Sequence, residues 1–133
     1  MILRVAHLFK MNNHENIEFW LIGDGPLWDH YRTKIEEQDL SKMVHLKGNQ
    51  DHILPWMDMM NILMITSHKE GLPFVLLEAL SRGVPVVSTD VGGVKEVVDP
   101  KRTKDIIVPI NDDLQMYHKL NHILKDGLEN LKR

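Results

Sequence analysis

The pair of carboxylates Glu70 and Glu78 is the feature of this sequence with the clearest chemical potential. The two glutamates stand eight positions apart, and between them lie a Gly-x-Pro turn and the apolar start of a helix. An ionised carboxylate is costly in apolar surroundings unless it is paired or bound to something polar. The spacing therefore indicates one carboxylate at the mouth of a helix and a second about two turns further on, both facing one elongated polar ligand.

The residues between the glutamates predict an anion site, because Pro73 is expected at the first position of a helix. The backbone amides of Phe74 and Val75 would then be free and directed towards a cleft, where a phosphate group binds readily. An ordinary alternative exists for Glu78. At about 100° per residue it shares a polar arc with Arg82, and helix geometry alone favours an i,i+4 ion pair on a solvated face.

Strands and helices are expected to alternate along the chain. The expected strands are 17–22, 43–46, 61–66, 84–88 and 105–108, and the expected helices are 2–11, 26–38, 52–60, 73–82, 94–98 and 112–131. The run 61–66 is almost entirely apolar, as in a strand that is buried on both faces. The alternation predicts an α/β fold with a Rossmann-like parallel sheet of about five strands and helices on both faces. Ligands of such sheets bind beyond the carboxyl ends of the strands, where the loop 67–73 carries Glu70.

Composition narrows the classes of function. Hydrophobic residues make up 43% and charged residues 26%, and the length of 133 residues suits one soluble domain. The net charge of −3 gives no basic footprint for nucleic acid, and no apolar run is long enough for a membrane span. The chain has no cysteine, which excludes thiol catalysis and fits a reducing compartment such as the cytoplasm. Its eight histidines are scattered, so no metal site is expected.

The segment 67–96, with the paired glutamates and the following Val-Pro-Val-Val strand, closely resembles the signature of one family of enzymes. These are the retaining glycosyltransferases with two Rossmann-like domains, the GT-B architecture, and more narrowly their family 4, the glycosyl transferases group 1. The Gly-Asp-Gly-Pro turn at 23–26 and the strand ending at Gly48 fit the same family. The resemblance covers nearly the whole chain. It implies that residues 1–133 form a single, partial C-terminal domain that binds the nucleotide-sugar donor.

The resemblance also implies roles for individual residues. Glu78 would accept hydrogen bonds from the ribose hydroxyls, and Glu70 would be catalytic, contacting the donor sugar and stabilising an oxocarbenium-like state. Backbone amides between them would hold the diphosphate or sugar, but Pro73 stands where many relatives have glycine and has no N–H to donate. Gly48 and Asn49 would lie near the base. The implied donor-binding residues are Glu70, Gly71, Leu72, Phe74, Val75, Glu78, Gly48 and Asn49.

The implied reaction transfers a hexose from a UDP- or GDP-linked sugar to a glycan or lipid-linked acceptor with retention of anomeric configuration, as in polysaccharide biosynthesis. No cofactor or metal is implied. Many relatives work at the inner face of the membrane, so we expect a cytoplasmic protein whose missing domain supplies any peripheral membrane contact. Two alternatives stay open: a non-catalytic nucleotide-sugar-binding or interaction module, and a sugar-nucleotide epimerase or hydrolase of similar architecture.

Two parts of the family's pattern have no counterpart in this sequence. The donor domain normally begins with a strand and a loop whose arginine and lysine grip the diphosphate, whereas residue 1 already falls in the helix that should follow. The missing strand would lie between the strands 17–22 and 61–66, so the chain must leave a gap, pair those strands directly or borrow a strand. The acceptor-binding domain is also missing, and transfer needs both substrates held together. We therefore expect the isolated chain to be inactive, as a fragment or one piece of a split enzyme.

Overall fold

The computed structural model describes residues 1–23, 25–67 and 74–131. The strands are β1 Phe19–Ile22, β2 Val44–Gly48, β3 Leu63–Ile65, β4 Val86–Thr89 and β5 Ile107–Val108. The helices are α1 Ile2–Met11, α2 Trp28–Glu37, α3 Leu54–Met59, α4 Phe74–Ser81, α5 Val94–Val97, α6 Thr103–Ile106 and α7 Asp113–Leu131, with a 3-10 turn at Pro100–Arg102. The predicted α/β class, with alternating helices and parallel strands, is confirmed.

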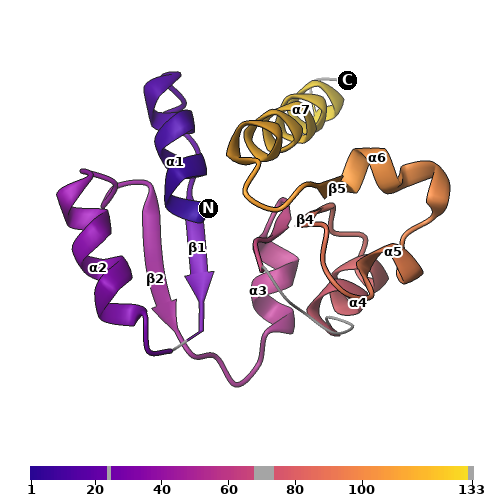
Figure 1. Ribbon diagram of the computed structural model, residues 1–133, viewed down its shortest axis with the longest axis horizontal. Coiled ribbons are helices and arrows are strands. Elements are labelled where there is room, and N and C mark those ends of the chain that lie inside the picture. The colour runs from indigo at the N-terminus through magenta and orange to yellow at the C-terminus, as the bar shows by residue number, and fades with distance from the viewer. Residues whose placement is uncertain (24, 68–73, 132–133) are drawn as a thin grey trace. The chain divides into compact units, whose positions relative to one another are not determined.

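The strands form two parallel sheets (Figure 1). β1 pairs with β2 in a register that runs from Phe19 opposite Val44 to Ile22 opposite Gly48. The second sheet has the order β3-β4-β5. Among the described residues β1 does not pair with β3, so the expected alternative in which these two strands pair directly is not observed.

The chain forms two compact units, Met1–Ile53 and Leu54–Arg133. The first unit contains β1 and β2 with α1 and α2, and the second contains the other strands and helices. The division agrees with the strand pairing, because no ladder joins the two sheets in the described part of the chain. The assignment of residues 1–133 to one donor-binding domain stays a prediction.

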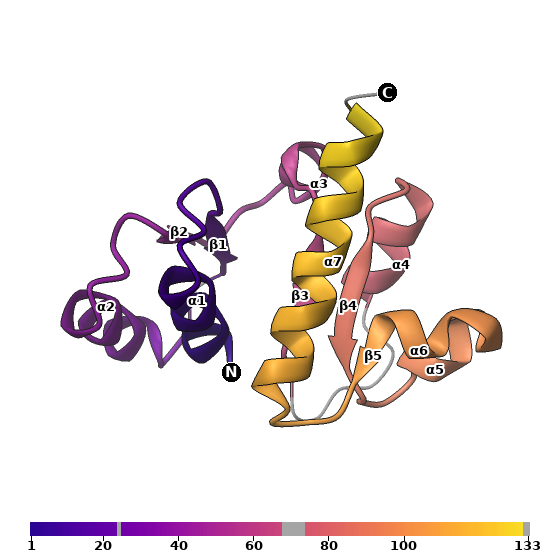
Figure 2. The ribbon, with the colours of Figure 1, turned by 90° about the horizontal axis from the view of Figure 1, so that it is seen from above.

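An apolar stripe of α1 forms the core of the first unit. Val5, Ala6 and Phe9 recur at helical spacing and are fully buried. The ring centroid of Phe9 lies 5.7 Å from that of Phe19 on β1. Figure 2 shows α1 and α2 on the same side of β1 and β2, and Ile35 on α2 is also buried. One face of this sheet therefore packs against both helices.

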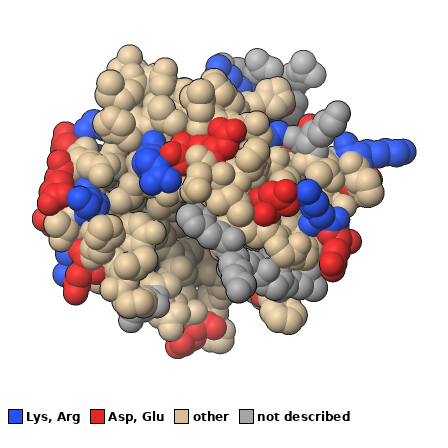
Figure 3. Space-filling model, viewed as in Figure 1, with Lys and Arg blue, Asp and Glu red and all other residues tan. Residues whose placement is uncertain are grey.

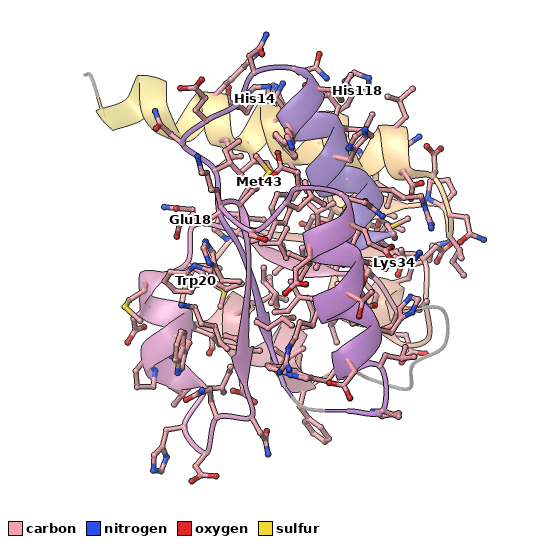
Figure 4. The ribbon with its side chains drawn as sticks, turned by 90° about the vertical axis from the view of Figure 1, so that its left-hand side faces the viewer. His14, Glu18, Trp20, Lys34, Met43 and His118 are labelled. Carbon is pink, nitrogen blue, oxygen red and sulfur yellow. The ribbon has the colours of Figure 1, made fainter. Side chains whose placement is uncertain are left out.

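Successive residues of a strand point to opposite faces of the sheet. The side chains on the other face of this sheet are connected by polar contacts. Trp20 Nε1 donates a hydrogen bond of 3.1 Å to Glu18 Oε2, and Figure 4 shows the side chains of Trp20 on β1 and of Glu18, just before this strand, close together. Lys47 Nζ lies 5.3 Å from the centroid of the Trp20 ring, which is a cation–π contact between neighbouring strands. His45, opposite Trp20 in the register, has its Nε2 3.8 Å from Glu18 Oε1.

β4 is the centre of the second unit. It lies between β3 and β5, and all four of its residues are buried. Helices α4 and α5 cover one side of this sheet and α7 covers the other (Figures 1 and 2). The predicted burial of strand 61–66 on both faces is wrong for Leu63 and Met64, which are half-buried. The reason is that β3 lies at the edge of its sheet, where among the described residues only β4 pairs with it.

The last predicted strand, 105–108, is only partly correct, since β5 begins at Ile107 and the two residues before it end α6. The side chain of Asp99 accepts a hydrogen bond of 2.9 Å from the amide of Lys101, and Pro100 takes the first position of the 3-10 turn. An acidic cap followed by proline starts helical structure. The 3-10 turn continues into α6, which therefore includes residues 105 and 106 of the predicted strand.

Charged side chains of both signs are mixed on the face shown in Figure 3, in keeping with the small net charge of −3. Most ion pairs are exposed, such as Lys34 with Glu37 at 3.2 Å, and pairs of this kind contribute about 0–1 kcal/mol each. Stability therefore rests mainly on the two apolar cores. Within the described ranges, no helix has both the length and the apolar character that crossing a membrane requires.

An ion pair joins the end of α1 to the turn after α2. Lys10 Nζ donates to the backbone carbonyl of Asp39 at 2.7 Å and to Asp39 Oδ2 at 3.0 Å. The hydrogen bond from Lys10, together with its positive charge, holds the pKa of the Asp39 carboxyl below its ordinary value. Because the folded pKa is the lower one, this contribution to stability is present above the unfolded pKa and is lost as the pH falls through the folded pKa.

Replacing Lys10 with glutamine is expected to raise the pKa of Asp39 towards the ordinary aspartate value of about 3.9. Titration of the carboxyl carbons by NMR in the wild type and in Lys10→Gln measures this change. Lys34→Gln is the matched control, because Lys34 pairs with Glu37 instead, and it should leave Asp39 unchanged. Equal Asp39 pKa values in the wild type and in Lys10→Gln would contradict the assigned cause.

Candidate functional site

The structure divides the eight predicted donor-binding residues into three groups. Those in the sequence just before α4 lie outside the described residues: Glu70, Gly71 and Leu72. Those on α4 lie in the second unit: Phe74, Val75 and Glu78. Those at the end of β2 lie in the first unit: Gly48 and Asn49. The two described groups belong to different units.

Helix α4 positions Glu78 by burying its opposite side. Leu76 and Ala79 are fully buried and belong to the same core cluster as Val86 of β4. At 100° per residue, Phe74 and Glu78 fall within about 40° of each other and roughly opposite to the buried pair. Phe74 is 76% exposed, whereas Glu78 is half-buried. The carboxylate therefore lies one turn from the helix start, on the face that does not contribute to the core.

The ordinary ion pair between Glu78 and Arg82 does not form in the structure. Arg82 Nη1 lies 2.5 Å from Asp58 Oδ1 on α3. Ser81 Oγ donates a hydrogen bond of 2.7 Å to the backbone carbonyl of Glu78 and leaves its carboxylate untouched. Among the described residues, the Glu78 carboxylate has no hydrogen-bond or ion-pair partner. A half-buried carboxylate of this kind is available to a ligand.

Two features of α4 suit an anionic ligand that also carries hydroxyl groups. The first amides of a helix have no partner within it, and the positive end of the helix dipole favours a phosphate there. One turn further on, the Glu78 carboxylate is a strong acceptor for hydroxyl donors. A phosphate linked to a sugar or nucleoside satisfies both features. In the part of the chain that the structure describes, no three His, Asp or Glu side chains come together as a metal site would need.

Gly48 closes the end of β2 in a conformation that favours glycine. Its φ is +74°, in the left-handed region that other residues rarely adopt. The amide of Gly23 donates a hydrogen bond of 2.8 Å to the Gly48 carbonyl, so this oxygen already has a partner at the end of β1. Asn49, the next residue, is exposed. The assignment of Gly48 and Asn49 to a base stays a prediction from the resemblance.

Two residues that shape the surroundings of α4 were not predicted from the sequence. Asp58 holds Arg82, and the fully buried Thr89 donates from Oγ1 to the carbonyl of Ser67 at 2.6 Å. These partners are separated by 24 and 22 positions respectively, so the periodic patterns of helices and strands cannot find them. The one signal in the sequence is a pair of hydroxyl residues at the end of an otherwise apolar strand.

Comparison with known proteins finds one family. The sequence profile described as Glycosyl transferases group 1 matches residues 1–126. The N-acetyl-alpha-D-glucosaminyl L-malate synthase of Bacillus anthracis is 30% identical over 117 residues, covering 88% of this chain and 30% of that protein. The Vi polysaccharide biosynthesis protein VipC/TviE of Salmonella typhi is 35% identical over 86 residues, covering 65% of this chain and 15% of that protein. The chain thus spans 30% or less of the length of these two relatives.

Solved structures have the same fold. TarM matches with a TM-score of 0.81 and 25% identity, over 96% of this chain and 26% of its own. HepE from Anabaena, solved in complex with UDP, matches with a TM-score of 0.79 and 20% identity, over 93% of this chain and 35% of its own. These likenesses confirm the Rossmann-like fold of GT-B glycosyltransferases. Since the family profile covers nearly the whole sequence, the chain belongs to the glycosyl transferases group 1 family.

Proposed function

We propose that this chain binds a nucleotide-sugar donor through α4 and the residues just before it, as the donor-binding domain of a hexosyltransferase. The observation that carries the proposal is the Glu78 carboxylate, half-buried one turn from the helix start and without a partner among the described residues. The two neighbouring hydroxyls of a ribose each supply an O–H donor to such a carboxylate. The HepE complex, which contains UDP, supports a nucleotide as the ligand.

The diphosphate is assigned to the start of the same helix. The amides of Phe74 and Val75 belong to the first turn of α4, where no carbonyl within the helix can accept from them. We assign the backbone of Gly71 and Leu72 to the same ligand. Pro73 has no N–H, so this sequence offers one backbone donor fewer than a sequence with glycine at that position.

Glu70 is assigned to the donor sugar, close to the reacting centre. Its carboxylate would stabilise the positive charge that develops on the sugar as the bond to the diphosphate breaks. We further propose that the hexose is transferred with retention of configuration and without a metal or cofactor. In this scheme Glu70 acts at the sugar and Glu78 at the nucleoside, which are opposite ends of one donor molecule.

The complete reaction needs an acceptor bound beside the donor. Because the chain spans 30% or less of the two relatives described above, we assign acceptor binding to a further domain or to a partner chain. The likeness to a polysaccharide biosynthesis protein of Salmonella typhi supports a glycan or lipid-linked acceptor. We propose UDP or GDP as the leaving nucleotide and the cytoplasmic face of a membrane as the place of work.

Calorimetric titration with UDP and with GDP tests the donor-binding step. We expect one of the two to bind at one site, and inorganic pyrophosphate, which lacks the ribose, to bind more weakly. If neither nucleotide binds, the proposal is wrong.

A labelled UDP- or GDP-hexose then distinguishes the possible reactions. Transfer only when the chain is mixed with a partner indicates a split enzyme, whereas release of free sugar or formation of an epimer indicates a hydrolase or an epimerase. Binding without any reaction indicates a binding module.

A further inference from the structure

The ladder between β3 and β4 ends where the connection to α4 begins. Its last pair is Ile65 opposite Ser88, and β3 stops at Ile65. β4 continues for one more residue, Thr89, whose side chain is fully buried. A buried hydroxyl group requires a hydrogen-bond partner, because its desolvation is otherwise uncompensated. The hydrogen-bond partner of the Thr89 hydroxyl therefore shows which part of the chain this side chain holds.

A side-chain hydrogen bond continues the connection between the two strands beyond the end of the ladder. Thr89 Oγ1 donates to the backbone carbonyl of Ser67 at 2.6 Å, which is short for this type of bond. Ser67 is the last described residue before α4, which begins seven positions later at Phe74. The bond therefore fixes the point at which the chain leaves the sheet on its way to the helix.

The neighbouring hydroxyl is used differently. Ser88 is also fully buried, but its Oγ donates to the carbonyl of Thr89, the next residue of its own strand, at 2.8 Å. The end of β4 is held separately, by a hydrogen bond of 2.9 Å from the amide of Asp90 to the carbonyl of Val108. β4 thus has its own backbone partners, and the hydroxyl of Thr89 serves the connection to α4 instead.

We propose that Thr89 is a positioning residue for donor binding. Its hydroxyl holds Ser67, the last described residue before α4, and we infer that this anchor helps to present the start of the helix and its Glu78 face to one ligand. The inference rests on the donor site proposed above. Valine has nearly the shape of threonine but no hydroxyl, so Thr89→Val would leave the Ser67 carbonyl without this donor. Thr89→Ser keeps the hydroxyl and is the conservative variant.

Calorimetry with UDP and GDP, together with amide hydrogen exchange of the free protein, tests this role. We expect Thr89→Val to weaken nucleotide binding about tenfold, equivalent to about 1.4 kcal/mol, and Thr89→Ser to stay within about twofold of the wild type. Thr89→Val should also speed exchange in peptides that span Ser67 and the start of α4. Ser88→Ala is the matched control. It removes an equally buried hydroxyl from the same strand and should change neither readout.

Two results would overturn the inference: wild-type affinity and exchange in Thr89→Val, or equal effects from Ser88→Ala, which would indicate general loosening of β4. If the wild type binds neither UDP nor GDP, the proposed function fails. The hydrogen-exchange experiment then still decides whether the Thr89 hydroxyl holds Ser67 in place. If Thr89→Val does not fold, the comparison of Thr89→Ala with Thr89→Ser gives the same contrast, and rescue by serine alone supports the role of the hydroxyl.

Discussion

Replacing Glu78 with alanine is expected to weaken the binding of UDP or GDP by about 10- to 100-fold. Hydrogen bonds from ribose hydroxyls to a charged acceptor contribute about 1.5–3 kcal/mol, which corresponds to this loss. Because the carboxylate has no partner among the described residues, its removal leaves no other charge unpaired. We therefore expect the free energy of unfolding to change by less than about 0.5 kcal/mol. Calorimetry and thermal unfolding of the same preparation measure the two effects.

Two control variants make this test specific. Glu78→Gln keeps one acceptor oxygen but loses the charge, so its affinity should lie between those of the wild type and Glu78→Ala. Glu36→Ala makes the same substitution at an exposed position of α2 and should leave the affinity unchanged. Unchanged affinity in Glu78→Ala would remove Glu78 from the site. A similar loss in Glu36→Ala would show that the effect comes from net charge rather than from contact.

The orientation of α4 could be predicted from the sequence because the 100° rotation per residue links position to burial. The helix wheel separates Glu78 from the apolar arc that contains Leu76 and Ala79, and both of these residues are fully buried. The position of β4 was predictable for a similar reason, since the apolar run 84–87 is typical of a buried strand. In each case the residues of one element carry the information that places it.

The partner of Arg82 could not be predicted, because the choice depends on how two helices pack. In the sequence Glu78 is the nearest carboxylate at helical spacing, but α3 brings Asp58 to Arg82 in the folded chain. The partial exposure of Leu63 has a similar origin, since it follows from the edge position of β3 rather than from the residues of that strand. Features that depend on contacts between distant elements were therefore missed, and the availability of Glu78 is one of them.

The second large effect is expected in the first unit, where Phe9→Ala should lower the free energy of unfolding by about 3–5 kcal/mol. Phe9 is fully buried, and its ring lies within 5.7 Å of the ring of Phe19, measured between centroids. The unit spans only Met1–Ile53, and a domain of this size buries a modest core. Typical domains are stable by about 5–15 kcal/mol in total, so the loss of one such side chain removes a large part of that margin.

Urea unfolding and hydrogen exchange measure this prediction, with Met11→Ala as the matched control on the same helix. Met11 is 65% exposed, so its truncation should change stability by less than about 0.5 kcal/mol. Equal stability of the two variants would show that Phe9 does not anchor the core.

Hydrogen exchange resolves the two units separately. Because no strand ladder joins their sheets in the described residues, we expect Phe9→Ala to raise exchange mainly within residues 1–53, while α4 and β4 keep their protection. Equal loss of protection in both units would instead show that the core around Phe9 also supports the helix that carries Glu78.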